Sequence, residues 1–131
     1  MKIARIDHLV LTVRDIDAAC AFYTRVLGMT EITFDDRRAL SFGQQKINLH
    51  QAGAEFTPHA QHPTVGSGDF CLISAVPLDD VIHHLRECEV EIIEGPVERA
   101  GAVGTLRSVY FRDPDQNLIE VSEYMFEMPE A

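Results

Sequence analysis

The sequence has no tryptophan, few cysteines and little positive charge. Its 11 lysines and arginines are outnumbered by 21 aspartates and glutamates, which gives a formal net charge of −10, and the basic residues form no cluster. Nucleic acids and anionic membrane surfaces are bound by clustered basic side chains, so this composition argues against both as partners. No apolar stretch approaches the roughly 20 residues that cross a bilayer. Phosphate-binding loops, nucleophile elbows and dinucleotide-binding fingerprints are also absent from the sequence.

The cysteines Cys20, Cys71 and Cys88 are an odd number, lie far apart and form no Cys-x-x-Cys pair. Disulfide frameworks and zinc sites use closely spaced or even-numbered cysteines, so buried free thiols in a reducing compartment are expected. The apolar run after Lys2 is interrupted by Asp7, and a secretory leader is therefore not predicted. These features predict a cytoplasmic protein.

Three segments far apart in sequence are typical of strands in which apolar and polar residues alternate. They are residues 7–13 (DHLVLTV), 46–51 (KINLHQ) and 117–122 (NLIEVS). Successive side chains of a strand point to opposite faces, so the apolar set is expected in the core and His8, His50 and Glu120 on the other face. Two imidazoles and a carboxylate are suitable ligands for Fe, Ni, Zn, Mn or Co, and such a set leaves positions open for substrate.

Two helices are expected, at residues 16–27 and 77–88. Asp15 is placed to cap the start of the first helix, Gly28 to end it, and Pro77 to begin the second. The remaining strands are predicted at residues 29–34, 38–42, 69–75, 90–93 and 107–112.

Two loops and a tail complete the pattern. Residues 52–68 are rich in glycine, proline and histidine, and a loop of this length is more often functional than idle. Residues 95–106 hold three glycines and are expected to form a second mobile loop. Residues 125–131 are predicted to fray or to dock on a partner.

The order strand, helix, strands occurs twice, with about 60 residues in each unit. A duplicated unit predicts two curved half-sheets that face each other, with helices outside and a groove between them. His8, His50 and Glu120 would then converge in that groove. The competing interpretation is that each of the three is an ordinary polar residue on a wet strand face. It is the better interpretation for any one of them alone, but their matching places in the repeat favour a ligand set.

Residues 7–15 (DHLVLTVRD), together with Phe22-Tyr23 and Leu27-Gly28, resemble the opening module of the vicinal-oxygen-chelate superfamily, and residues 111–120 (FRDPDQNLIE) resemble its closing module. That superfamily contains glyoxalases, extradiol dioxygenases, fosfomycin-resistance transferases, epimerases and bleomycin-binding proteins. Within it, the chain is most similar to the glyoxalase-domain-containing protein 5 group.

The resemblance covers about residues 3–124 and implies an α+β fold of paired βαβββ modules that form a cupped mixed sheet with helices outside. It implies one domain over residues 1–131, with module one at about 3–52, a loop at 53–68 and module two at about 69–124. Relatives usually pair, so a homodimer is expected.

The superfamily pattern also implies metal ligands on the first, fourth, fifth and eighth strands. His8 matches the first position, His50 the fourth and Glu120 the eighth. Many relatives begin the fifth strand with histidine, whereas this chain has Asp69 there. Asp69 is either an oxygen ligand or a loop residue that caps a backbone group, because the alternation of apolar residues does not decide which face of that strand is buried.

Two residues are candidates for catalysis. Tyr110 lies ten residues before Glu120, the spacing at which extradiol dioxygenases place a groove tyrosine, and alternation favours its neighbours Val109 and Phe111 for the core. His50 lies near the place of an acid–base histidine in the same enzymes, so it is either a ligand or a proton-transfer group. The four other histidines are expected on the surface.

The first functional hypothesis is a metal-dependent enzyme that binds two adjacent oxygens of a small substrate. Glyoxalase-like lyase or isomerase chemistry is favoured over ring-cleaving dioxygenase chemistry, because the fifth-strand histidine is missing. The alternative is a metal-free drug-binding protein of the bleomycin-resistance type. Such binders line the groove with aromatic residues, and the lack of tryptophan favours the enzyme.

Overall fold

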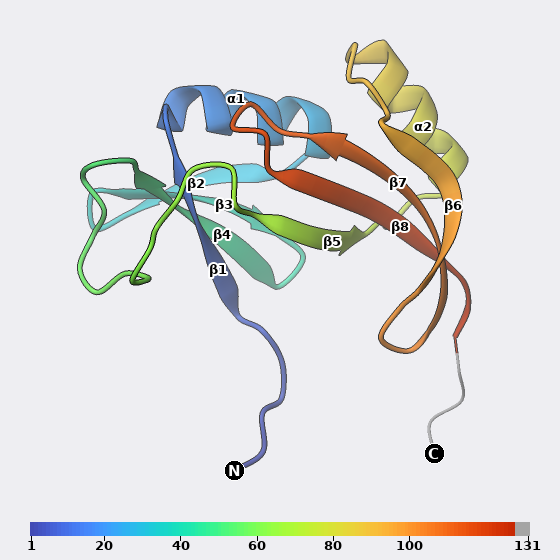
Figure 1. Ribbon diagram of the computed structural model, residues 1–131, viewed down its shortest axis with the longest axis horizontal. Helices are drawn as coiled ribbons and strands as arrows, with labels where there is room; N and C mark the ends of the chain where they lie inside the picture. Colours follow the sequence, from blue (N-terminus) through green and yellow to red (C-terminus); the bar gives the residue numbers. More distant parts are fainter. Residues whose placement is uncertain (128–131) are drawn as a thin grey trace. The chain divides into compact units, whose positions relative to one another are not determined.

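The computed structural model describes residues 1–127, and the chain within it forms two helices and eight strands (Figure 1). In chain order the first five elements are β1 (His8–Val13), α1 (Ile16–Leu27), β2 (Thr30–Phe34), β3 (Arg37–Phe42) and β4 (Gln45–Gln51). The next five are β5 (Asp69–Ile73), α2 (Leu78–Glu87), β6 (Glu94–Ala100), β7 (Gly104–Arg112) and β8 (Leu118–Glu127). Among these residues, neither helix is long and apolar enough to cross a membrane.

Two compact units contain these elements. Unit 1 comprises Met1–Ser67 with Pro114–Gln116, and unit 2 comprises Gly68–Asp113 with the chain from Asn117. Their sheets have the same topology, β1-β4-β3-β2 and β5-β8-β7-β6, in which the first two strands are parallel and the others antiparallel. This confirms the α+β class and the pair of βαβββ modules. The groove expected between the modules stays a prediction.

Helix α1 begins and ends as the sequence predicts. The Asp15 carboxylate accepts a hydrogen bond from the backbone N–H of Ala18, at 3.2 Å, and so satisfies one of the free donors at the helix start. Gly28 ends the helix with φ 67°, a left-handed conformation that glycine adopts without steric cost. Helix α2 begins at Leu78, with Pro77 at the cap position.

Two predictions for the chain after α2 are wrong. Residues 90–93 are not a strand, and residues 95–106 are not one loop, because β6 occupies Glu94–Ala100 and β7 begins at Gly104. Gly95 and Pro96 looked like loop residues, but β6 is the edge strand of its sheet, where proline is tolerated. The pairing of β6 with β7 has an irregularity between Glu94 and Val97 that absorbs both residues.

The prediction that the tail frays is also wrong where the structure describes it, and the alternative that it docks on a partner stays a prediction. Met125–Glu127 belong to β8, while residues 128–131 lie outside the described part of the chain.

One face of each sheet packs against the helix of its own unit. In unit 1 the fully buried residues on this face include Val13, Leu40 and Ile47, and in unit 2 they include Phe111 and Ile119. Burying side chains of this size contributes about 1.5–3 kcal/mol each. Since side chains alternate along a strand, the opposite face of each sheet carries the polar residues between these core positions.

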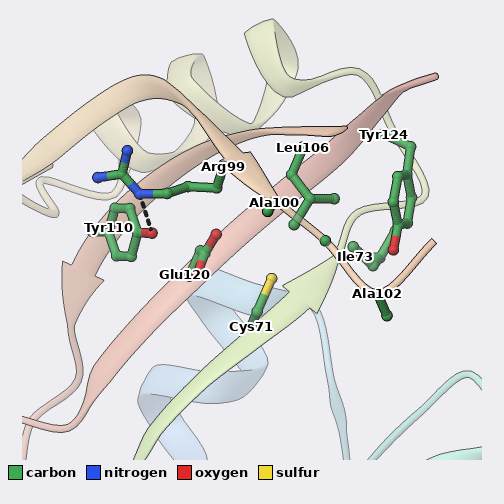
Figure 2. A pocket seen from close by; sticks show the side chains of 10 residues that line it. Cys71, Ile73, Arg99, Ala100, Ala102, Leu106, Tyr110, Glu120 and Tyr124 are labelled. Atoms are coloured by element: carbon green, nitrogen blue, oxygen red, sulfur yellow. Dashed lines mark hydrogen bonds between the residues drawn. The ribbon is translucent and has the colours of Figure 1, made fainter. Parts of the chain in front are cut away.

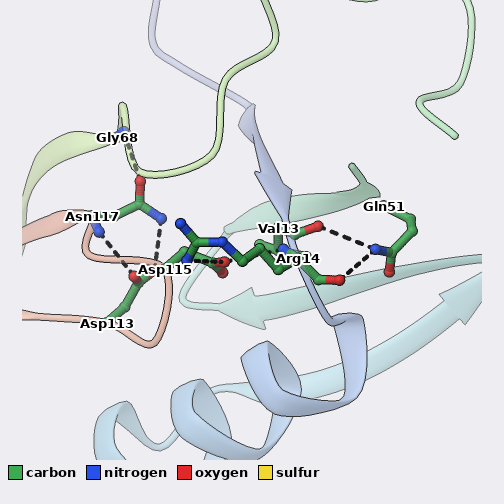
Figure 3. Close-up of polar contacts among 7 residues, drawn as sticks. All are labelled: Val13, Arg14, Gln51, Gly68, Asp113, Asp115 and Asn117. Carbon is green, nitrogen blue, oxygen red and sulfur yellow. Dashed lines mark hydrogen bonds and ion pairs between the residues drawn. The ribbon is translucent and has the colours of Figure 1, made fainter. Parts of the chain in front are cut away.

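A buried turn fixes the start of β8 (Figure 3). The backbone N–H and the side-chain amide of Asn117 donate to the two carboxylate oxygens of Asp113, at 3.0 and 2.8 Å. The amide oxygen of Asn117 accepts from the N–H of Gly68 at 2.7 Å, directly before β5. These bonds set the register of β5 and β8, the parallel pair in unit 2.

A second polar cluster, in unit 1, holds the end of β1. The backbone N–H of Arg14 donates to Asp115 Oδ1 at 3.0 Å, and the side-chain amide of Gln51 donates to the carbonyl oxygen of Arg14 (Figure 3). The strand therefore ends at Val13, and helix α1 begins three residues later.

Candidate functional site

Unit 2 has a cavity of about 360 Å³ on the face of its sheet that carries the polar residues. Figure 2 shows the side chains that line it, and they come from β5, β6, β7 and β8 and from the β6–β7 loop. They include Cys71, Ile73, Arg99, Leu106, Tyr110 and Glu120. Tyr110, Glu120 and Cys71 lie side by side on neighbouring strands, because Glu120 pairs with Tyr110 on one side and with Cys71 on the other.

Two serine hydroxyl groups hold the carboxylate of Glu120. Ser108 donates to Glu120 Oε2 at 2.7 Å, and Ser122 donates to the same oxygen at 3.2 Å. Both serines are fully buried, and their hydroxyl oxygens are 2.6 Å apart. Neither of these bonds involves Glu120 Oε1. Among the described residues, Glu120 forms no ion pair, so its negative charge faces the cavity without a cationic partner from the protein.

Tyr110 connects Glu120 with the cation of the cavity. Arg99 Nε–H donates to the Tyr110 hydroxyl oxygen at 3.0 Å, and the guanidinium lies 5.4 Å from the centre of the Tyr110 ring. Burial raises the pKa of the Tyr110 hydroxyl; Arg99 opposes this rise and the carboxylate of Glu120 adds to it. Tyr110 therefore stays protonated at neutral pH, and its O–H remains available to donate a hydrogen bond.

Cys71 is exposed, which contradicts the expectation that all three thiols are buried. It shares one face of β5 with Asp69 and Ile73, because β5 pairs in register with β8. Its sulfur lies 3.2 Å from the hydroxyl oxygen of Ser122. Burial against the cavity wall raises the pKa of the Cys71 thiol, and the nearby Glu120 carboxylate adds to the rise, so the group is a thiol rather than a thiolate.

Asp69 is exposed and is the first residue of β5. The register places its side chain on the same face as Cys71 and Glu120, which the sequence pattern left open. It pairs with Leu118, two positions before Glu120.

In unit 1 the corresponding face of the sheet carries His8, which is exposed at the start of β1. His8 Nδ1 lies 2.9 Å from Asp7 Oδ2, and the hydrogen bond from His8 lowers the pKa of the Asp7 carboxyl. A carboxylate that accepts the Nδ1–H of a histidine fixes the tautomer and leaves Nε2 as a lone-pair donor. Asp7 and His8 thus have the arrangement found at many metal-binding histidines.

His50 is 5% exposed and packs edge-on against the Phe56 ring, with the ring centroids 5.4 Å apart. Burial lowers the pKa of His50, and the positive charge of Arg37 lowers it further, so the imidazole is neutral near pH 7. Its Nδ1 is buried and has no hydrogen-bond partner. The register pairs His50 with Thr12 but His8 with Lys46. The two histidines are therefore four positions apart, about 13 Å along the strands.

Asn48 is the residue that the sequence argument missed. Its side-chain oxygen Oδ1 is buried without a partner, and it lies two positions closer to His8 than His50 does. The parallel strand pair has the same register in both sheets. Asn48 pairs with Val10, which lies two residues after His8. In the same way, Glu120 pairs with Cys71, which lies two residues after Asp69. The alternation of residues 46–51 already placed Asn48 on the polar face, and comparing the two repeats position by position would have singled it out.

No three histidine, cysteine, aspartate or glutamate side chains gather within reach of one ion in the part of the chain that the structure describes. Each unit instead offers its own donors: His8, Asn48 and His50 on one sheet, and Glu120 and Asp69 on the other. The four histidines of the long loop and of α2 are exposed, as predicted.

Comparisons with known proteins identify relatives along almost the whole chain. The profile of the Glyoxalase/Bleomycin resistance protein/Dioxygenase superfamily matches residues 5–121. The virulence protein STM3117 of Salmonella typhimurium is 54% identical over 126 residues, which are 95% of this chain and 88% of that protein. The glyoxalase domain-containing protein RDO1 of Mycosarcoma maydis is 50% identical over 125 residues, 95% of this chain and 70% of that protein.

Solved structures agree with these sequence matches. The crystal structure of the same Salmonella protein superposes with a TM-score of 0.94 and covers 95% of this chain and 100% of that one. A lactoylglutathione lyase from Agrobacterium tumefaciens superposes with a TM-score of 0.72 at 26% identity, and covers 94% of this chain and 96% of that one.

Proposed function

Because the chain belongs to the Glyoxalase/Bleomycin resistance protein/Dioxygenase superfamily, we propose that it is a metal-dependent enzyme that binds two adjacent oxygens of a small substrate. Glyoxalase-like lyase or isomerase chemistry is preferred over ring cleavage by a dioxygenase. The reason is Asp69, which stands where ring-cleaving relatives are expected to have a histidine. The similarity to a lactoylglutathione lyase supports the same preference.

The observation that carries the proposal is the state of Glu120. A carboxylate in a partly enclosed cavity is expected to have a cationic partner, because burial in a medium of low polarity disfavours the charge. Glu120 has none among the described residues, yet two buried serine hydroxyls hold one of its oxygens in place. A carboxylate that is fixed but unpaired is suited to a divalent cation or to a proton from the substrate.

In this proposal the metal ligands are those that the superfamily pattern implies, and they come from both sheets. Glu120 offers a carboxylate oxygen, and His8 offers Nε2 while Asp7 engages Nδ1. Asn48 Oδ1 is a buried oxygen without a partner, so we assign the fourth-strand position to Asn48 in place of His50. Asp69 is the candidate from the fifth strand. An Fe, Ni, Zn, Mn or Co ion held by such residues would bind two neighbouring substrate oxygens and stabilise negative charge on them.

The chain's own residues supply the proton chemistry. Tyr110 accepts a hydrogen bond from Arg99 through its oxygen, and the carboxylate of Glu120 is the acceptor nearby for its own O–H. In this proposal a substrate oxygen in the cavity replaces Glu120 as that acceptor. His50 is neutral near pH 7, and the resemblance to the superfamily implies that it is the proton-transfer group. In this proposal His50 is a general base and Tyr110 a hydrogen-bond donor.

Elemental analysis of protein purified without added metal tests the proposal. We expect a stoichiometric divalent ion in the wild type, and its loss in His8→Ala, Asn48→Ala, Glu120→Ala and Glu120→Gln. The controls are Glu98→Gln, an exposed carboxylate on β6, and His62→Ala, an exposed histidine in the long loop. Both controls should retain the ion. Wild-type protein without metal, whose melting temperature is unaffected by chelators and by added divalent ions, would contradict the proposal.

A metal-free drug-binding protein is the second candidate, and the two tyrosines that line the cavity, Tyr110 and Tyr124, favour it, because such binders line the groove with aromatic residues. A drug-binding function predicts that the Glu120 variants and the wild type bind aromatic, drug-like compounds with the same affinity. The homodimer and the cytoplasmic location are further proposals, for which sedimentation and cell fractionation are the direct tests. The narrower similarity to the glyoxalase-domain-containing protein 5 group also stays a prediction.

A further inference from the structure

The cavity in unit 2 has two chemically different ends (Figure 2). Arg99, Tyr110 and Glu120 gather at one end. The other end is formed by Ile73, Leu106 and the ring of Tyr124 together with small residues of the β6–β7 loop, and the Tyr124 hydroxyl there accepts a hydrogen bond from the backbone N–H of Val103. A molecule that fills this cavity therefore has a polar head and an apolar body.

Arg99 is the only cation that lines the cavity in the described part of the chain. A guanidinium has five N–H donors. Three of them bind the Tyr110 hydroxyl, the backbone carbonyl of Glu98 and the carboxylate of Glu94, each at 3.0 Å. One N–H on each terminal nitrogen remains for a ligand, and a carboxylate is the group that matches this pair of donors.

The ion pair between Arg99 and Glu94 does not prevent such binding. The two side chains are 39% and 57% exposed, and a pair of this kind is weak in water. Glu94 does not line the cavity. A carboxylate that approaches from the cavity would add to this contact or replace it at Nη2.

We infer that Arg99 recognises the carboxylate of the substrate, and that the substrate class is a 2-hydroxy or 2-oxo acid with a short alkyl chain. This inference rests on the proposed function for one point, the two adjacent oxygens. In an acid of this class they are one carboxylate oxygen and the oxygen on the neighbouring carbon.

The cavity accommodates each part of such a molecule. With its carboxylate at the terminal nitrogens of Arg99, the molecule has its C2 oxygen at the end of the cavity that Tyr110 and Glu120 also line. The proton on C2 of a hydroxy acid then faces the region of Glu120. The alkyl chain extends along Ile73 and Leu106, and burying each CH₂ there contributes about 0.8 kcal/mol.

Isothermal titration with 2-hydroxyhexanoate and with its neutral amide, 2-hydroxyhexanamide, tests the inference. The two probes have nearly the same size and the same hydroxyl group, but the amide is uncharged and has an NH2 group in place of one carboxylate oxygen. We expect the wild type to bind the acid at least about tenfold more tightly than the amide, since a hydrogen-bonded charge pair has this strength. Glycolate, which lacks the alkyl chain, should bind more weakly than 2-hydroxyhexanoate.

Single substitutions show which side chain causes the preference for the acid over the amide. Arg99→Gln should reduce the acid-to-amide ratio to about one, and Arg99→Lys should retain part of it. Glu94→Gln should raise the affinity for the acid, because it removes the competing carboxylate. Arg107→Gln is the matched control: Arg107 lies on the same sheet but bonds Asp79 and Glu123 on the opposite face, and its loss should leave the ratio unchanged.

A ratio that persists in Arg99→Gln would overturn the inference, and so would a wild type that binds neither probe at up to about 10 mM or that shows no preference. Metal content is measured separately on the same samples. A wild type without metal that still prefers the acid through Arg99 would contradict the proposed function but not the carboxylate site. A wild type that contains metal but does not prefer the acid would contradict the carboxylate site and leave the proposed function standing.

Discussion

Removing the Ser108 hydroxyl is predicted to weaken metal binding without removing any ligand. Ser108 donates to Glu120 Oε2 at 2.7 Å, and hydrogen bonds to charged groups contribute about 1.5–3 kcal/mol. Ser122 remains as a second, longer donor at 3.2 Å, so the loss should be at the lower end of that range. At about 1.4 kcal/mol per factor of ten, Ser108→Ala should lower the affinity for a divalent ion about tenfold. The double variant Ser108→Ala/Ser122→Ala should lower it about a hundredfold.

The measurement is titration of metal-stripped protein with Mn, Ni or Zn, followed by calorimetry. Ser74→Ala is the control, because the Ser74 hydroxyl bonds only local backbone of the β5–α2 connection. Circular dichroism at each titration temperature verifies that every variant is folded. If the double variant binds the ion within about twofold of the wild type while Glu120→Ala does not bind it, the serines do not position Glu120 and the reasoning from their hydrogen bonds is refuted.

Three further predictions concern stability. In the folded protein, burial keeps the pKa of His50 below its ordinary value of 6.5. As the pH falls, the unfolded chain therefore binds a proton at His50 before the folded protein does. The free energy of unfolding should decrease below about pH 6.5 and should not change through His50 above it. In His50→Gln, the melting temperature should no longer fall below about pH 6.5. A fall as large as in the wild type would show that another group causes it. Gly95→Ala should destabilise by about 2–4 kcal/mol in urea unfolding, because φ is +107° and a Cβ would lie 2.4 Å from the carbonyl oxygen of Ser108. Gly43→Ala, at φ +50° in open space, should cost only about 1–2 kcal/mol, and equal costs would show that the contact is irrelevant. Asn117→Ala should cost about 2–4 kcal/mol, because it removes the two hydrogen bonds that the side-chain amide forms with the buried Asp113 carboxylate and with the Gly68 N–H, and a loss below about 1 kcal/mol would contradict this account of the turn.

Much of the local structure follows directly from the sequence. Asp15 and Gly28 bound α1 because capping depends on a side-chain oxygen and on a left-handed φ, both properties of single residues. The faces of β7 and β8 follow from alternation, which placed Val109 and Phe111 in the core and Tyr110 on the opposite face. The repeat predicted two units with the same topology.

The site required information that no single segment contains. The strand β6 was missed because glycine and proline are unfavourable in a strand, and only its pairing with β7 at the sheet edge compensates. Arg99 was therefore assigned to a loop and its contact with Tyr110 was not foreseen. Asn48 was passed over because the parallel register of β1 and β4, which separates His8 from His50 by four positions, is set by the tertiary structure.

In the strands with clear alternation, the sequence by itself thus determined which side chains leave the core, because burial of apolar surface and the period of a strand are encoded locally. Only the tertiary structure decided which of those side chains meet. Hydrogen bonds such as those of Ser108 and Arg99 join residues 11 or 12 positions apart, on different strands, and their formation depends on strand pairing and register.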